Sequence, residues 1–178
     1  MSERRTQMLE AAVRVIAQDG VRGLRVEKLA AEAGVSTALI YYHFKDRAGI
    51  LRAALGHVNH RARVYTEPAD GDPRAQLEQM LLAELQDVAQ VRETSVAWGE
   101  LRASAVFHAE LREPLEAATR AWNADVAELV RAVDRELDCE AVAERLTALV
   151  EGLSERWHSG SVSLERAREL LTGALRDL

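Results

Sequence analysis

The chain carries two adjacent tyrosines, Tyr41 and Tyr42, followed at once by His43. Neighbouring side chains on a helix point about 100° apart, so the two phenol rings cannot both enter one core. At least one tyrosine is therefore expected at the surface. Lys45 and Arg47 follow closely. Hydroxyl, imidazole, ammonium and guanidinium groups suit the oxygens of phosphates, and such contacts position a protein on a duplex without reading its sequence.

The helix that would present these side chains is framed by local signals. Gly34 can take the left-handed conformation of a sharp turn. Ser36 can cap a new helix by accepting a hydrogen bond from a first-turn N–H, which predicts a short helix over 37–43. The ring of Phe44 would then anchor the end of this helix in a core.

Two helices are expected before this one. Apolar residues at helical spacing mark both: Met8, Ala11, Ala12, Val15 and Ile16 precede Gly20, and Val26, Leu29, Ala30 and Ala33 precede Gly34. Two short helices joined by a glycine turn, with a third before them, match a helix-turn-helix unit. The spacing alone also fits any small helical bundle.

The remainder of the chain is helical by the same criteria. A fourth helix is expected over 45–64, a loop over 65–73, and further helices over 73–90, 94–107, 109–137, 142–157 and 164–178. No segment has the pattern of a strand, so the fold class is all-α. Gly49 lies inside the fourth helix, where glycine costs about 1 kcal/mol relative to alanine. No motif accounts for it.

Composition and charge limit the class of protein. Of 178 residues, 48% are hydrophobic and 29% charged, as in folded helical proteins. Residues 1–56 hold nine basic and six acidic residues, a net +3, whereas residues 57–178 hold 14 and 23, a net −9. This division suits one end that meets a polyanion, although ordinary surface variation also produces such differences.

The expected location is the cytoplasm. Cys139 is the single cysteine, which excludes an internal disulfide and a zinc site of several thiolates. The N-terminal MSERRTQMLE is polar where a signal peptide would be apolar, and no apolar run approaches the roughly 18 residues of a membrane span. No membrane partner is expected.

Residues 4–55 resemble the DNA-binding domain of the TetR family of bacterial transcriptional regulators. The matching features are a first helix ending at Gly20, the turn LAAEAGVS, the YYHF that closes the third helix, and a basic residue three positions after Phe44. The resemblance implies a helix-turn-helix DNA-binding domain over 1–46 and a helical ligand-binding and dimerisation domain over 47–178. It further implies a homodimeric repressor that binds a palindromic double-stranded DNA operator and is released by a small-molecule effector.

The resemblance also assigns DNA contacts. Positions early in the third helix would face bases, and the tyrosines, the histidine and the basic residues would bind phosphates. The full set is Arg25, Ser36, Thr37, Ala38, Leu39, Tyr41, Tyr42, His43, Lys45 and Arg47. Arg25 stands where the family usually has a threonine that caps the second helix, and Thr37 and Leu39 replace a basic and a small polar residue. Contact with a thymine methyl is then a substitute for some base hydrogen bonds.

By the same resemblance, the last two helices would pair with their copies in a second subunit. The residues with the required apolar spacing are Leu146, Leu149, Val150, Leu153, Leu164, Ala167, Leu171 and Ala174.

The aromatic residues of the acidic part are candidates for an effector pocket. The predicted ligand-binding residues are Trp98, Arg102, Phe107, His108, Trp122 and Trp157, with core packing as the alternative for each tryptophan. His57 and His60 have the spacing of a metal pair but lack further ligands, so no metal and no cofactor are expected.

Two other functional classes remain as alternatives. A helical protein-interaction module would bind its partner with little dependence on salt, whereas a DNA reader loses affinity steeply as salt rises. An enzyme on a helical bundle is the third class, but the chain has no recognisable catalytic motif, so it is classed as a non-enzyme.

Overall fold

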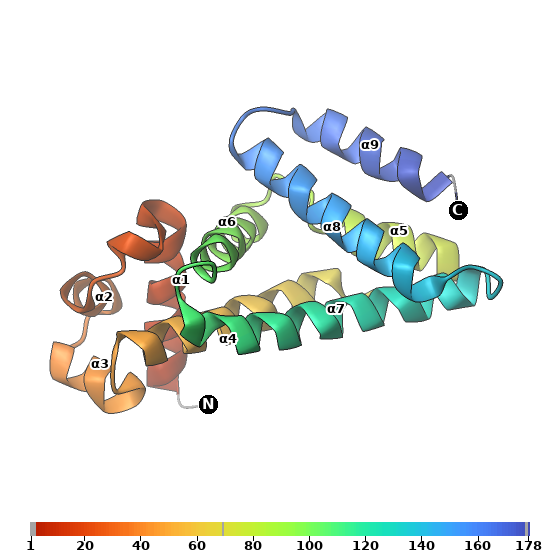
Figure 1. Ribbon diagram of the computed structural model, residues 1–178. Coiled ribbons are helices and arrows are strands. Elements are labelled where there is room, and N and C mark those ends of the chain that lie inside the picture. The colour runs from red at the N-terminus through yellow and green to blue at the C-terminus, as the bar shows by residue number, and fades with distance from the viewer. Residues whose placement is uncertain (1–2, 69, 177) are drawn as a thin grey trace. The chain divides into compact units, whose positions relative to one another are not determined.

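The computed structural model describes residues 3–68, 70–176 and 178, and this part of the chain is helical without any strand. The order of elements can be followed in Figure 1. The helices are α1 Glu3–Gly23, α2 Val26–Ala33, α3 Thr37–Phe44, α4 Arg47–Thr66, α5 Pro73–Leu82, α6 Ala89–Ser104, the 3-10 helix η1 Ala109–Leu111, α7 Arg112–Val133, α8 Cys139–His158 and α9 Leu164–Arg176. The all-α fold class is confirmed.

Helix ends differ from the predicted ones where tertiary contacts compete with periodicity. The helix expected over 73–90 ends at Leu82, and α7 ends at Val133 and not at residue 137. After α5 the chain turns so that Leu85 becomes fully buried and Glu84 accepts a hydrogen bond from the Tyr65 hydroxyl.

The chain forms two compact units. The first comprises Met1–Arg61 and Val96–Glu116, and the second comprises Ala62–Ser95 and Ala117–Leu178. The domains expected from the sequence, 1–46 and 47–178, are divided at the end of the helix-turn-helix motif. The compact units are instead defined by which residues contact one another. Helices α4, α6 and α7 each contribute residues to both units.

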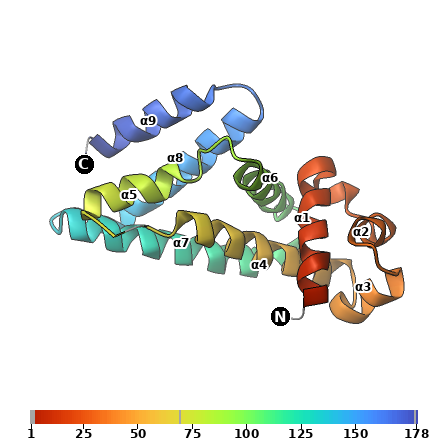
Figure 2. The ribbon, with the colours of Figure 1, turned by 180° about the vertical axis from the view of Figure 1, so that it is seen from behind.

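The first unit packs the N-terminal helices around one core. Helix α1 packs on α2, and α2 packs on α3. Figure 2 shows these three helices together. Side chains that are buried to within 2% in this core include Leu9, Ile16, Leu29, Ile40, Ile50, Leu51 and Leu55. Because α3 joins this core through few residues, most of its surface stays exposed.

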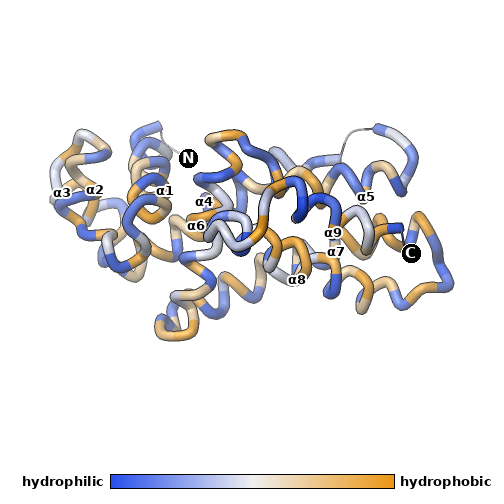
Figure 3. The backbone as a smooth tube through the Cα atoms, turned by 90° about the horizontal axis from the view of Figure 1, so that it is seen from above, coloured by the Kyte–Doolittle hydropathy of each residue, from blue (hydrophilic) through white to orange (hydrophobic). Residues whose placement is uncertain are grey.

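The second unit is built on the long C-terminal helices. Helix α9 packs against α8 and against α5, as Figures 1 and 2 also show. Its core contains Leu81, Val126, Val130, Ala143 and Leu171. Hydrophobic and hydrophilic residues alternate along its helices (Figure 3). Within the described residues, no helix has both the length and the apolar content to cross a membrane.

Candidate functional site

The turn between α2 and α3 has the geometry that its sequence predicts. Gly34 adopts φ 64° and ψ 37°, the left-handed conformation, and ends α2. Ser36 begins α3, and its Oγ accepts a hydrogen bond from the N–H of Leu39 at 3.2 Å. This cap satisfies one of the N–H groups that a helix leaves open at its start. A helix of only two turns is thus fixed at its beginning.

Helix α3 is anchored on one face and open on the other. Ile40 is fully buried and Phe44 is 5% exposed, so both side chains fix the helix to the first unit. Tyr42 is 81% exposed and Tyr41 49% exposed. The ring of Tyr42 packs edge-on against His43, with centroids 5.2 Å apart. The side chains of both tyrosines are therefore accessible to solvent on the open face of α3.

The residues expected to face bases divide between surface and core. Thr37 and Ala38 are exposed at the start of α3. Leu39 is partly buried and packs against the core of the first unit. Its side chain is therefore less open to a ligand than those of its two predecessors.

The basic residues near α3 also differ in their surroundings. Lys45 ends the helix with φ 66° and is exposed. Arg25 is exposed at the start of α2 and makes no side-chain cap, as expected where a threonine is replaced. In contrast, the Arg47 guanidinium donates to the carbonyl oxygens of Val21 at 2.7 Å and Leu24 at 3.4 Å. Arg47 is thus engaged within its own unit.

Gly49 has a structural reason that the sequence did not reveal. A Cβ atom at this position would overlap the carbonyl oxygen of Phe44, the last residue of α3. The N–H of Gly49 donates to Oδ1 of Asp46 at 2.7 Å. The glycine therefore allows the first turn of α4 to lie directly against the end of α3.

The predicted effector-binding residues belong to two units. Trp98 is partly buried and packs against the first core, and Phe107 is 83% exposed. His108 Nδ1 lies 3.2 Å from Glu110 Oε1. Arg102 also belongs to the first unit.

Trp122 and Trp157 belong to the second unit and pack against its core. The Arg92 guanidinium lies 4.8 Å from the centre of the Trp157 ring, in a cation–π arrangement.

A partly buried acidic site in the second unit was not expected from the sequence. Glu84 accepts a hydrogen bond from the Tyr65 hydroxyl at 2.9 Å. Burial, partly opposed by this bond and reinforced by the nearby Glu151 carboxylate, raises the pKa of Glu84 to about 7. The three residues come from α4, the segment after α5, and α8, so no sequence motif unites them.

Helix α8, which carries Glu151, has further polar residues on the same face. Polar residues recur along α8 at intervals of four, three and four residues, which places them on one face of the helix. They are Thr147, Glu151, Ser154 and His158. Thr147 Oγ1 donates to Asn123 Oδ1 at 2.7 Å, and Ser154 Oγ lies 3.4 Å from Ser95 Oγ.

His158 ends this face of α8. Burial, with the nearby Arg92 as a second cause, lowers the pKa of His158 to about 4. The imidazole is therefore neutral at pH 7.

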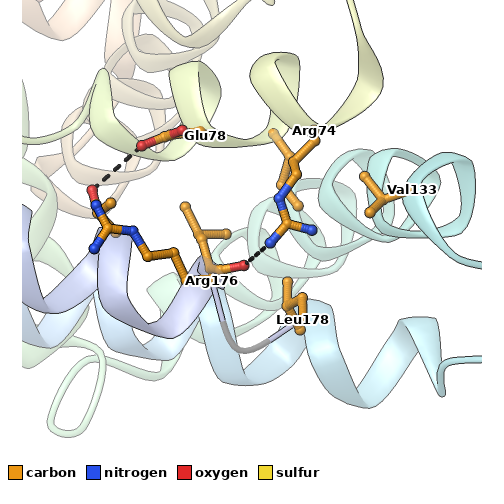
Figure 4. A pocket seen from close by; sticks show the side chains of 8 residues that line it. Arg74, Glu78, Val133, Arg176 and Leu178 are labelled. Atoms are coloured by element: carbon orange, nitrogen blue, oxygen red, sulfur yellow. Dashed lines mark hydrogen bonds between the residues drawn. The ribbon is translucent and has the colours of Figure 1, made fainter.

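A separate small pocket of about 130 Å³ lies among α5, α7 and the end of the chain. Figure 4 shows Arg74, Glu78, Val133, Arg176 and Leu178 around it. Arg74 donates to the carbonyl oxygen of Leu175 at 2.5 Å, and Thr172 donates to Glu78 at 3.4 Å. None of the predicted effector-binding residues is among the side chains that line it.

Several residues predicted for a dimer interface are buried within a single chain. Leu146, Val150, Leu153, Ala167 and Leu171 are at most 4% exposed and form part of the second core. Leu149, Leu164 and Ala174 are partly buried. The exposed apolar side chain on α9 is Leu170, at 36%.

Comparison with known proteins agrees with this geometry. The family described as "Bacterial regulatory proteins, tetR family" matches residues 8–54, and "BetI-type transcriptional repressor, C-terminal" matches residues 73–178. The HTH-type transcriptional regulator BetI of Burkholderia ambifaria is 27% identical over 165 residues, which cover 90% of this chain and 83% of that protein.

Solved structures give the same result. A TetR-family regulator of a Rhodococcus species is 49% identical with a TM-score of 0.91, and the match covers 99% of this chain and 98% of the other. A regulator of Saccharomonospora viridis, solved in complex with choline, has the same fold at 24% identity and a TM-score of 0.84 over 99% and 97% of the two chains.

Proposed function

The chain belongs to the TetR family of bacterial DNA-binding transcriptional regulators, and from that membership we propose that it is a homodimeric repressor that binds a palindromic operator. Residues 1–46 would bind DNA, and residues 47–178 would bind the effector and the second subunit. The observation that carries this proposal is the open face of α3, where the exposed Tyr41 and Tyr42 stand beside the buried anchors Ile40 and Phe44.

The proposed DNA contacts follow from exposure. Thr37 and Ala38 are available for base edges, and Leu39 for partial apolar contact. The set proposed for the phosphate backbone is Arg25, Ser36, Tyr41, Tyr42, His43 and Lys45. Arg47 is left out of this set because its guanidinium is bonded to two carbonyl groups of its own unit.

The proposed dimer would join the exposed faces of α8 and α9. A single two-turn reading helix contacts few base pairs, and two copies related by a two-fold axis would read half-sites about 34–36 Å apart or a little more. Leu170, with the partly buried Leu149 and Ala174, supplies apolar surface for this contact. Replacing Leu170 by Glu should give a monomeric mass in solution, and an unchanged dimeric mass would overturn the interface.

For the effector we propose a small cation bound beside Glu84 and Glu151. Two neighbouring carboxylates inside a protein repel one another, and a cation between them removes that repulsion. Choline is the first ligand to test because the S. viridis neighbour was solved with it. Bound choline would lower the pKa of Glu84 and release protons near pH 7. Calorimetry in two buffers of different ionisation enthalpy would detect this release, and Glu84→Gln should abolish it.

The regulatory role is tested by selecting genomic DNA fragments on the purified protein. Enrichment of a palindromic sequence upstream of genes supports the proposal. Absence of any enriched sequence, or binding that is indifferent to salt, would instead support a protein-interaction module.

A further inference from the structure

The turn between α1 and α2 is held by side chains of two other helices. Gly20 departs from helical geometry with φ 71° and ψ 173° inside the segment Glu3–Gly23. The next residue, Val21, is 1% exposed, and Leu24 is 2% exposed. The chain therefore enters α2 through a turn that buries the side chains of Val21 and Leu24, and peptide groups at buried residues need hydrogen-bond partners.

Helix α6 supplies one of these partners. The N–H of Val21 donates to Oε2 of Glu100 at 3.1 Å. A Cβ atom on Gly20 would lie 2.7 Å from the same oxygen, closer than such contacts occur. Gly20 thus serves two purposes here, since it adopts a positive φ and leaves space for the carboxylate.

Helix α4 supplies the other partner. The carbonyl oxygen of Val21 accepts a hydrogen bond from Arg47 Nη2 at 2.7 Å. Both polar groups of Val21 are therefore held by charged side chains from elsewhere in the sequence. Hydrogen bonds to charged groups are shorter and stronger than neutral ones.

The two helices that hold Val21 are shared between the compact units. The first unit ends at Arg61 within α4 and resumes at Val96 within α6. Residues 62–66 of α4 and 89–95 of α6 belong to the second unit. We therefore expect a displacement of either helix along its axis to act on the α1–α2 turn. It would reach α3 because α2 packs on α3.

We propose that Glu100 is a positioning residue that couples α6 to the DNA-binding helices through Val21 and Gly20. Its carboxylate fixes the α1–α2 turn relative to α6, and the orientation of α3 follows from this. Glu100 touches no DNA in this account. The inference rests on the proposed function, because its consequence is the distance between the two reading helices of a dimer.

The test measures affinity for a series of palindromes that differ only in the number of base pairs between half-sites. The wild-type protein should prefer one spacing, and Glu100→Ala should reduce that preference by about fivefold or more, the usual scale of coupling between sites. Glu100→Gln retains an amide oxygen that can accept from Val21 and should keep the wild-type profile. Glu32→Gln is the control, because it removes a charge and an exposed bond to Arg14 within the N-terminal helices.

Amide hydrogen exchange of residues 20–25 provides a readout that needs no DNA. Faster exchange in Glu100→Ala, with wild-type rates in Glu100→Gln, supports the inference. Unchanged exchange in Glu100→Ala would overturn it, whatever the DNA results. An unchanged spacing profile in Glu100→Ala, or equal loss in Glu32→Gln, would also overturn it. A wild-type protein that binds single half-sites as well as palindromes would contradict the dimeric repressor, and the exchange experiment would then decide on Glu100 alone.

Discussion

The imidazole Nε2 of His57 lies 2.7 Å from Oε1 of Glu10, and this contact joins α4 to α1. Arg61, one turn further along α4, donates to the other oxygen of the same carboxylate at 3.1 Å. His57 and Arg61 are 6% and 8% exposed. The Glu10 carboxylate thus contacts two buried basic side chains, one through each of its oxygens.

Removal of this carboxylate should destabilise the protein. Glu10→Ala deprives two buried polar groups of a partner, and we expect a loss of about 2 kcal/mol in the free energy of unfolding, measured with urea. Glu32→Ala removes the exposed ion pair with Arg14, whose side chains are 38% and 37% exposed. This control should change stability by about 0.5 kcal/mol or less. Equal losses in both variants would contradict a special role of Glu10.

Gly49 and Gly56 offer a matched pair on α4. Gly49→Ala places a methyl group against the Phe44 carbonyl, so we expect a loss of stability of about 2 kcal/mol and weaker DNA binding. Nothing lies within 4 Å of a Cβ at Gly56, so Gly56→Ala should stabilise by up to about 1 kcal/mol through helix propensity. Thermal unfolding of both variants measures this difference. A stabilising Gly49→Ala would show that α3 and α4 do not need this close contact.

Gly49 lies where local sequence signals no longer predict the structure. The start of α3 was predictable because its signals, Gly34 and Ser36, are local, and the predicted 37–43 agrees with Thr37–Phe44. The approach of α4 to the Phe44 carbonyl depends on packing and leaves no pattern beyond the glycine itself. The end of α5 was missed for a similar reason, because burial of Leu85 overrides a helical periodicity that continues past it.

The functional residues divide in the same way. Exposure of at least one of Tyr41 and Tyr42 follows from the geometry of adjacent residues on a helix, and the structure exposes both. Apolar spacing on α8 and α9 cannot distinguish a chain's own core from a contact with another chain. Leu153, for example, is buried in the core of its own chain. The contact of Tyr65 with Glu84 joins segments 19 residues apart, so it required the structure.

Tyr42 and Lys45 should affect DNA binding in different ways. Tyr42→Phe removes a neutral donor, so affinity should fall two- to tenfold on all DNA sequences, corresponding to about 1 kcal/mol, without a change in salt dependence. Lys45→Met removes a cation and should reduce the slope of log affinity against log salt by about 1 per subunit. Fluorescence anisotropy at several salt concentrations measures both. Sequence-dependent losses in Tyr42→Phe would contradict a phosphate contact.

The pKa of Glu84 makes a prediction about pH. Its value of about 7 in the folded protein lies above the ordinary 4.5, so the folded state holds a proton that the unfolded state has lost between these values. Stability should therefore fall as pH rises from about 4.5 to 7, by up to about 3 kcal/mol from this group. Glu84→Gln stays neutral, so its advantage over wild type should grow across this window and level off above it.

Urea unfolding at each pH measures the effect of Glu84→Gln. Glu128→Gln, on the exposed surface of α7, is the control and should give a difference from wild type that changes little with pH. A constant difference for Glu84→Gln would show that the carboxyl group is not perturbed.

The most direct test of the regulatory account is the affinity for the selected operator, compared with duplexes in which one or both half-sites are scrambled, over a range of potassium chloride concentrations. The intact palindrome should bind about 10³-fold or more tightly than the fully scrambled duplex, and the logarithm of its affinity should fall linearly with log salt. Equal affinity for all three duplexes, or binding that does not respond to salt, would contradict it.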